Sequence, residues 1–370
     1  MSGPGSAKRA LRRAAIEIER RWDTSRLGRH DREPPEKFRI VTYLGHGGPS
    51  RVVVRGRVLD NSDPGLAEEG EGTWVAVRRT ADRFLTVELP GVPLRVTIGS
   101  TAAETSTDEE GYFDLLLDAG DTPFSAPVQV GEVGLASRYR GLEPPFSTPV
   151  RVRVPTEAAA YGVISDVDDT ILLTGAQRLM AMVRQTMTGS ALTRLAFPGS
   201  PELYRALAES GGEPDVNPFF YVSSSPWNLH DFLIHFLRHR GFPEGPLLLR
   251  DLLGSSPQRS HVTHKLGRIA EVLDLHPDLP FVLIGDSGQH DPEIYADVVR
   301  QHPGRILAVY IREVRLDPGD GRVEAVAETW DAHVPLVVAA DSAAVARHAA
   351  ELGLVTLETA EAIVAATSGG

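Results

Sequence analysis

One stretch, residues 161–172, decides the fold class of this 370-residue chain; it reads Tyr-Gly-Val-Ile-Ser-Asp-Val-Asp-Asp-Thr-Ile-Leu. Its apolar first half is typical of a buried strand, and we expect the strand to end where the acids begin, because aspartate is a poor strand residue. Three carboxylates follow within four residues: Asp166, Asp168 and Asp169. Each raises the others' cost of ionising unless a cation neutralises them. The stretch therefore predicts a strand ending in a site for a hard cation such as Mg²⁺, with a solvated turn as the alternative.

Further apolar runs alternate with helical patterns from residue 158 onward. They predict strands at residues 161–165, 218–222, 246–250, 280–284 and 305–311. Strands that alternate with helices are typical of an α/β fold with a doubly wound, Rossmann-like parallel sheet. Ligands bind such sheets at the carboxyl ends of the strands. We therefore expect the residues that follow these strands to form the functional site.

The strand predicted at 218–222 runs into three hydroxyls, Ser223, Ser224 and Ser225, followed by Pro226. Proline is favoured as the first residue of a helix, so we expect a helix from Pro226 that Ser225 caps. Hydroxyls and free backbone N–H groups at a helix start can bind an anion. Ser223, nearest the strand end, is preferred over Ser224 as a phosphate contact.

The strand predicted at 280–284 also ends in an acid, Asp286, which has no evident structural purpose. Asp291, before Pro292, could serve either the metal site or only the helix that follows. Lys265 is one of only three lysines in the chain, and it opens a predicted helix. This position could require a compact ammonium rather than a planar guanidinium, with chance survival of one lysine as the alternative, and the helix start would place it near the same edge.

The chain before residue 158 has two predicted parts. Residues 1–40 contain a basic amphipathic helix and a linker, and this helix could dock on the protein or lie on an anionic membrane surface. Residues 41–157 show short alternating segments that predict an all-β sandwich as an accessory domain, including strands at 51–58 and 74–77. Gly45-His46-Gly47-Gly48 leads into a strand, which favours a turn over a phosphate cradle. Residues 158–370 form the predicted catalytic domain.

Composition narrows the classes of function. The chain has no cysteine, which excludes disulfides, a thiol nucleophile and thiolate metal sites. A net charge of −12 argues against nucleic acid as a partner. No signal or membrane-spanning run is evident, so we expect a cytoplasmic protein, with peripheral membrane contact if the basic helix provides it. The oligomeric state is not evident from the sequence.

Four motifs in this order resemble those of the haloacid dehalogenase superfamily of phosphotransferases. They are Asp166-x-Asp168-x-Thr170, Ser223, Lys265, and Gly285-Asp286 through Asp291. More narrowly, residues 158–315 resemble the catalytic domain of the actin-patch-associated phosphatidate phosphatases. The resemblance implies a haloacid dehalogenase-like fold and Mg²⁺-dependent hydrolysis of phosphatidate to diacylglycerol and phosphate. A proline-rich actin-adaptor tail is not evident, so no cytoskeletal role is expected.

The resemblance also implies roles for these residues. Asp166 would be the nucleophile that forms an aspartyl-phosphate, and Asp168 the general acid and base. Thr170, Ser223, Ser224 and Lys265 would bind the substrate, and the metal would be held by Asp166, Asp168, Asp286 and Asp291. Two other functions stay open: a phosphatase for a soluble phosphomonoester, and a non-catalytic membrane or protein adaptor that retains the fold.

Overall fold

The computed structural model describes residues 34–61, 87–167, 199–209, 212–250, 261–313, 326, 328–330 and 333–368. The basic helix predicted within residues 1–40 and the strand predicted at 74–77 lie outside these residues. The same holds for Asp168, Asp169 and Thr170. What is said of these segments therefore rests on the sequence.

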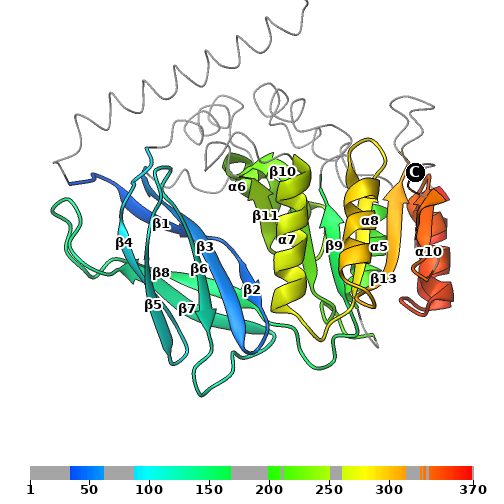
Figure 1. Ribbon diagram of the computed structural model, residues 1–370, viewed down its shortest axis with the longest axis horizontal. Coiled ribbons are helices and arrows are strands. Elements are labelled where there is room, and N and C mark those ends of the chain that lie inside the picture. The colour runs from blue at the N-terminus through cyan, green and yellow to red at the C-terminus, as the bar shows by residue number, and fades with distance from the viewer. Residues whose placement is uncertain are drawn as a thin grey trace, which may run out of the picture.

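Residues 38–153 contribute eight strands joined into one sheet, at the left of Figure 1. The order is β1-β3-β2-β8-β7-β4-β5, and β6 pairs with β3. The strands are β1 Phe38–Thr42, β2 Gly45–Gly47, β3 Arg51–Asp60, β4 Pro93–Ile98, β5 Thr101–Ser106, β6 Tyr112–Asp118, β7 Val128–Leu135 and β8 Ser147–Arg153. Buried alternate residues such as Leu94, Val96 and Ile98 form one apolar core between them.

The glycine-rich segment at 45–48 differs from the predicted turn. Gly45–Gly47 is strand β2, which pairs antiparallel with β3 and parallel with β8. A Cβ atom at Gly47 would lie 2.2 Å from the Arg51 carbonyl oxygen, so only glycine allows this approach. The glycines therefore serve close strand packing, and they bring His46 into the interior, where it is 1% exposed.

The rest of the described chain is a mixed α/β structure built on a six-stranded parallel sheet. Its order is β11-β10-β9-β12-β13-β14. The strands are β9 Gly162–Asp166, β10 Phe219–Pro226, β11 Leu247–Arg250, β12 Phe281–Asp286, β13 Ile306–Arg312 and β14 Leu336–Ala339. All five predicted strands are present, and β14, a four-residue strand at the sheet edge, was not predicted.

Helices cover both faces of this sheet. One face packs against α5 Ser200–Ala208, α6 His230–His239, α10 Ser342–Glu351 and α11 Leu357–Ser368. The other packs against α7 His261–Leu275 and α8 Asp291–Gln301, which lie in front of the sheet in Figure 1. Successive strand residues alternate between the two cores: Val163 faces the first and Ile164 the second. Burial on both faces explains the continuous apolar runs in the sequence.

The order of the strands fixes where a site can form. From β9 the chain builds outward through β10 and β11, then returns to the other side of β9 for β12, β13 and β14. The strand order thus reverses beside β9, which is where ligands bind in open α/β sheets.

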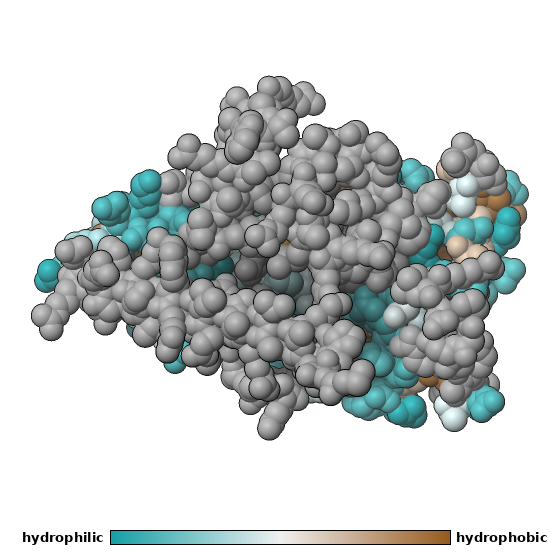
Figure 2. Space-filling view, turned by 90° about the horizontal axis from the view of Figure 1, so that it is seen from above, coloured by the Kyte–Doolittle hydropathy of each residue, from teal (hydrophilic) through white to brown (hydrophobic). Residues whose placement is uncertain are grey.

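No helix in the described parts of the chain is both long and apolar enough to span a membrane. Figure 2 shows mainly hydrophilic described residues over the eight-stranded sheet at the left, and a mixture of hydrophilic and apolar ones at the right-hand end, near the C-terminal helices.

Candidate active site

The carboxyl ends of three neighbouring strands bring the predicted polar residues to one edge. β9 ends at Asp166 and β12 at Asp286, while β10 continues beyond Ser223 to Pro226. Val222 is paired with Asp166, and Ile284 with Ser165, so the three strand ends lie level. Parallel pairing therefore places side chains 57 and 120 residues from Asp166 on either side of it.

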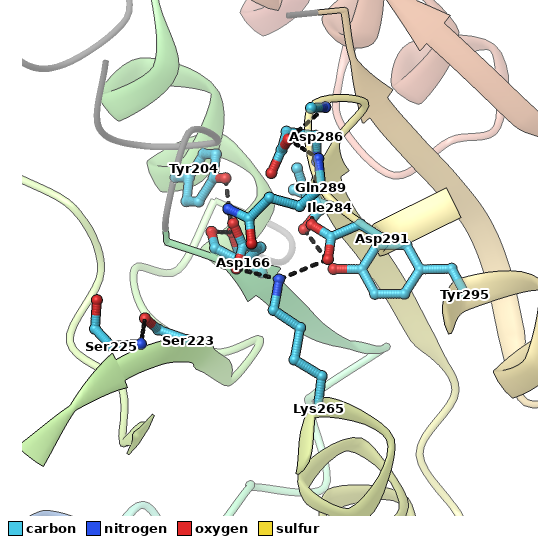
Figure 3. A network of polar contacts seen from close by, with 12 residues as sticks. Asp166, Tyr204, Ser223, Ser225, Lys265, Ile284, Asp286, Gln289, Asp291 and Tyr295 are labelled. Atoms are coloured by element: carbon cyan, nitrogen blue, oxygen red, sulfur yellow. Dashed lines mark hydrogen bonds and ion pairs between the residues drawn. The ribbon is translucent and has the colours of Figure 1, made fainter. Parts of the chain in front are cut away.

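Lys265 enters this edge from the first turns of α7. Its Nζ atom lies 2.7 Å from Asp166 Oδ1 and 2.6 Å from Asp291 Oδ1, as Figure 3 shows. Burial by itself would lower the pKa of the ammonium, but the charges of Asp166 and Asp291 outweigh it and raise that pKa above its usual value. Lys265 is therefore a permanent positive charge between two carboxylates.

Asp291 is the first residue of α8, not its cap. His290 holds the cap position, and no side-chain capping hydrogen bond is present there. The Asp291 carboxylate instead pairs with Lys265 and accepts a hydrogen bond from the Asp286 backbone N–H at 3.2 Å. Gly285 makes this possible, because a Cβ atom there would lie 2.7 Å from Asp291 Oδ2. The interpretation of Asp291 as only a helix cap is therefore wrong.

Asp286 is held by the turn that follows β12. Its Oδ1 atom accepts hydrogen bonds from the backbone N–H groups of Gly288, at 2.6 Å, and Gln289, at 3.0 Å. These donors fix the carboxylate and stabilise its charged form. Both backbone donors contact Oδ1, and neither contacts Oδ2.

The carboxylates of Asp166, Asp286 and Asp291 could together hold a metal ion. One ligand atom of each lies within 4.8 Å of the others, and all three residues are buried. With Lys265 the four side chains carry a net charge of −2, the sum of three negative charges and one positive. Oxygen donors of this kind suit a hard divalent cation such as Mg²⁺, and the charge of such an ion would neutralise the cluster.

Ser223 and Ser224 lie on β10, beside the carboxylate cluster. The Ser223 hydroxyl is buried and accepts a hydrogen bond from the Ser225 backbone N–H at 2.9 Å, in the stretch of β10 where its pairing with β11 shifts register (Figure 3). The Ser224 hydroxyl is also buried, and no hydrogen-bond partner for it is found among the described residues. The preference for Ser223 as the phosphate contact stays a prediction.

Three residues that support or border this edge were not predicted. Tyr204 of α5 shares a 2.8 Å hydrogen bond with the Ser165 hydroxyl, directly before Asp166. Burial raises the pKa of the Tyr295 hydroxyl well above its usual value, and this hydroxyl donates to the Ile284 carbonyl at 2.8 Å. Arg312, at the end of β13, is paired with Asp286 in register. The only sequence signal for Arg312 was its place after an apolar run, which did not distinguish it from other arginines.

The comparisons with known proteins bear on this edge. Residues 161–313, which include strands β9 to β13 and the whole of α7 and α8, match the family described as phosphatidate phosphatase APP1, catalytic domain. The matched segment makes up less than half of the chain. The match confirms the resemblance seen in the sequence motifs, and every carboxylate of the cluster lies within the family segment.

Two curated relatives agree with the family match. The phosphatidate phosphatase APP1 of Saccharomyces cerevisiae is 31% identical over 239 residues, which are 62% of this chain and 39% of the yeast protein. An uncharacterized protein of Schizosaccharomyces pombe is 28% identical over 158 residues, 42% of this chain and 25% of that protein. The chain thus spans well under half the length of either relative.

Among solved structures, a carbohydrate acetylesterase from Xanthomonas citri aligns with 81% of this chain and 68% of its own. The identity is 12% and the TM-score 0.26, too low to bear on the fold.

Proposed function

We propose that this chain is a Mg²⁺-dependent phosphatidate phosphatase that hydrolyses a lipid phosphomonoester to diacylglycerol and phosphate. One observation carries the proposal: a cluster of three buried carboxylates and a buried lysine at the ends of central strands, inside the segment of the APP1 catalytic-domain family. Buried charge is costly to maintain, and a non-catalytic adaptor has no evident use for it. The adaptor alternative is therefore disfavoured.

The proposal includes the finer architecture. Residues 158–370 would be a doubly wound, haloacid dehalogenase-like phosphatase domain, and residues 41–157 a β-sandwich accessory domain. The strand order with its reversal beside β9 and the single core of the eight-stranded sheet support these assignments. The protein would be cytoplasmic, and residues 1–40 would supply any contact with the membrane surface.

In the proposed mechanism, a carboxylate oxygen of Asp166 attacks the phosphorus atom and forms an aspartyl-phosphate as the ester P–O bond breaks. Asp168 gives its proton to the leaving alkoxide of diacylglycerol. It then takes a proton from the water that attacks the aspartyl-phosphate, which releases phosphate and restores Asp166. The role of Asp168 rests on the sequence alone. The buried position of Asp166, 1% exposed, would keep competing water from the nucleophile until substrate binds.

The other side chains of the edge would bind and orient. Lys265, with Ser223, Ser224 and Thr170, would contact the phosphoryl oxygens as negative charge redistributes among them. Asp286 and Asp291, with Asp166 and Asp168, would hold Mg²⁺. When bound, the ion would reduce the repulsion between the carboxylate and the phosphate.

A substrate panel tests this function. Phosphatidate in mixed micelles is compared with soluble phosphomonoesters, each with Mg²⁺ and with the ion removed by chelation. We expect Mg²⁺-dependent phosphate release that is fastest with phosphatidate. A strong preference for the soluble esters would reject the lipid substrate and support the soluble-phosphomonoester alternative.

Asp166→Asn tests the nucleophile. We expect it to abolish phosphate release while the circular dichroism spectrum stays that of the wild type. Asp297→Asn is the matched control, because Asp297 lies on α8 and its carboxylate pairs with the surface residue Arg300. Unchanged turnover in Asp166→Asn would exclude the proposed mechanism.

A further inference from the structure

Glu271 of α7 joins the catalytic part of the chain to the eight-stranded sheet. Its Oε2 atom lies 2.5 Å from Arg55 Nη2, and its Oε1 atom lies 3.3 Å from His46 Nε2. Arg55 belongs to β3 and His46 to β2. Arg268, one turn earlier on α7, lies 2.9 Å from Glu271 Oε2. One carboxylate of α7 thus contacts two strands of the other sheet.

The contact between Arg55 and Glu271 is largely removed from water. The Arg55 side chain is 8% exposed and that of Glu271 24%. Burial by itself would raise the pKa of the Glu271 carboxyl, but the interactions with His46 and Arg55 outweigh it and hold that pKa well below its usual range. Arg55 also donates from Nε to Asp114 Oδ2 at 2.7 Å, so its guanidinium is held at two points. A buried ion pair costs free energy unless its hydrogen bonds have good distances and angles. The pair therefore favours one placement of α7 relative to β3.

The outer side of this network faces a pocket of about 410 Å³. Asp114 and Arg268 line it, together with Tyr43 and Trp227. Water in this pocket would screen the 3.6 Å pair between Arg268 and the half-exposed Asp114. Arg55 lines the same pocket, but its side chain is only 8% exposed, so its pair with Glu271 is the better shielded contact between α7 and the eight-stranded sheet.

The same helix carries the lysine of the candidate site. Lys265 is six residues before Glu271, which corresponds to about 9 Å along the helix axis and about 120° around it. Lys265 can therefore reach the carboxylate cluster while Glu271 faces the eight-stranded sheet. The apolar side of α7, through Ile269, Val272 and Leu273, packs on the parallel sheet. Such packing tolerates small shifts along the helix axis better than a hydrogen-bonded ion pair does.

We propose that Glu271 is a positioning residue, through which Arg55 of the eight-stranded sheet sets the placement of α7 and hence of Lys265 between Asp166 and Asp291. The eight-stranded sheet would then contribute to the reaction by positioning Lys265, without contacting the substrate. The kinetic part of this inference rests on the proposed function, whereas the placement of Lys265 does not.

The test is Glu271→Gln, with Glu244→Gln as the matched control. Glu244 forms another carboxylate link to this sheet, with Arg151 of β8 at 3.1 and 3.0 Å, but it follows α6 and is not part of α7. Phosphate release is measured beside labelling of lysines with an amine-reactive reagent, quantified by mass spectrometry. The chain has only three lysines, and the exposed Lys37 is the internal reference for the buried Lys265.

We expect Glu271→Gln to lower kcat about 10- to 100-fold, because small misplacements of a catalytic group are costly, and to raise labelling of Lys265 several-fold relative to Lys37. Glu244→Gln should leave both values near those of the wild type. Arg55→Lys keeps a cation without the planar fork, so it should show a smaller change in the same direction.

The inference is wrong if Lys265 is labelled in Glu271→Gln to the same extent as in the wild type. It is also wrong if Glu271→Gln and Glu244→Gln change kcat and labelling equally. If the wild type releases no phosphate from any ester, the proposed function fails, and the labelling still decides whether Glu271 positions Lys265. If Glu271→Gln does not fold, Arg55→Lys decides by the same two readouts.

Discussion

Lys265 Nζ and Asp166 Oδ1 are 2.7 Å apart, and this ion pair joins the first turns of α7 to the end of the central strand β9. The nucleophile proposed from the sequence is thus already in contact with the cation proposed to bind phosphate. Because Lys265 also pairs with Asp291, removing it would leave three carboxylates together without a balancing charge.

The first prediction concerns this lysine. Lys265→Met should lower the free energy of unfolding by about 3–5 kcal/mol, because buried carboxylates lose their partner, and should reduce kcat at least about 100-fold. Urea unfolding and phosphate release measure the two effects. Lys37→Met is the control, since Lys37 is exposed. If Lys265→Met is as stable as the wild type and turns over normally, the ammonium is needed neither for stability nor for catalysis.

The second prediction concerns metal binding. Mg²⁺ at a hundredfold excess over its Kd should stabilise the folded wild type by about 2.7 kcal/mol, and Asp286→Asn should lose most of this increment. The reason is that Asp286 contributes a buried carboxylate to the cluster. Thermal unfolding with and without Mg²⁺ measures it without reference to activity. Asp274→Asn, an exposed position on α7, should respond to Mg²⁺ as the wild type does.

The third prediction concerns Gly285. Gly285→Ala should cost about 1–3 kcal/mol of stability and reduce activity, because its Cβ atom would lie 2.7 Å from Asp291 Oδ2 and displace that carboxylate. Gly267→Ala is the matched control. Gly267 lies inside α7, and a Cβ atom there would meet nothing within 4 Å. It should therefore stabilise the protein by about 0.5–1 kcal/mol. Equal behaviour of the two alanine variants in urea unfolding would contradict this explanation.

The fourth prediction concerns stability against pH. Burial lowers the pKa of His276 from 6.5 to about 3, with the nearby His46 and Arg305 acting in the same direction. Below pH 6.5 the unfolded chain therefore binds a proton at this position that the folded protein does not. Stability from the neutral imidazole is complete above pH 6.5 and is lost as the pH falls towards 3.

His276→Gln measures this contribution. The free energy of unfolding of the wild type should fall between pH 7.5 and pH 5, and the fall should be about 2 kcal/mol smaller in His276→Gln. The size follows because one pKa unit corresponds to about 1.4 kcal/mol. His46 remains in this variant as a second buried imidazole whose pKa burial lowers. An identical decline in both proteins would mean that His276 is not held neutral.

Several features could be predicted because they are written in short stretches of chain. Strands β9 to β13 were found from their apolar runs and from the polar residues that end them. The four-residue β14 was missed because so short a run carries little signal. The helix start at Pro226 was wrong: Pro226 is the last residue of β10, Trp227–Leu229 is a 3₁₀ turn, and α6 begins at His230 with no side-chain cap. Ser225 pairs locally within the strand end instead, which a capping pattern does not reveal.

In the candidate site, too, some residues could be predicted from local patterns and others could not. Asp166, Lys265 and Asp286 were named from the sequence, and the structure brings them together with Asp291, although their chemical roles stay predictions. Tyr204 and Arg312 were missed because a single tyrosine or arginine on an element has no local pattern that marks it. Glu271 was missed for a stronger reason: its partners His46 and Arg55 lie more than 200 residues away along the chain.

By itself, the sequence determined the alternation of strands and helices, the acids that end β9 and β12, and the kind of chemistry those acids allow. These properties depend on hydrophobic periodicity and on the preferences of neighbouring residues, which act over a few positions. Only the tertiary structure decided that Asp291 turns toward the cluster, that Lys265 lies between two carboxylates, and that α7 is held by the eight-stranded sheet. Those outcomes depend on strand order and on the pairing of buried charges, which are set by contacts between distant parts of the chain.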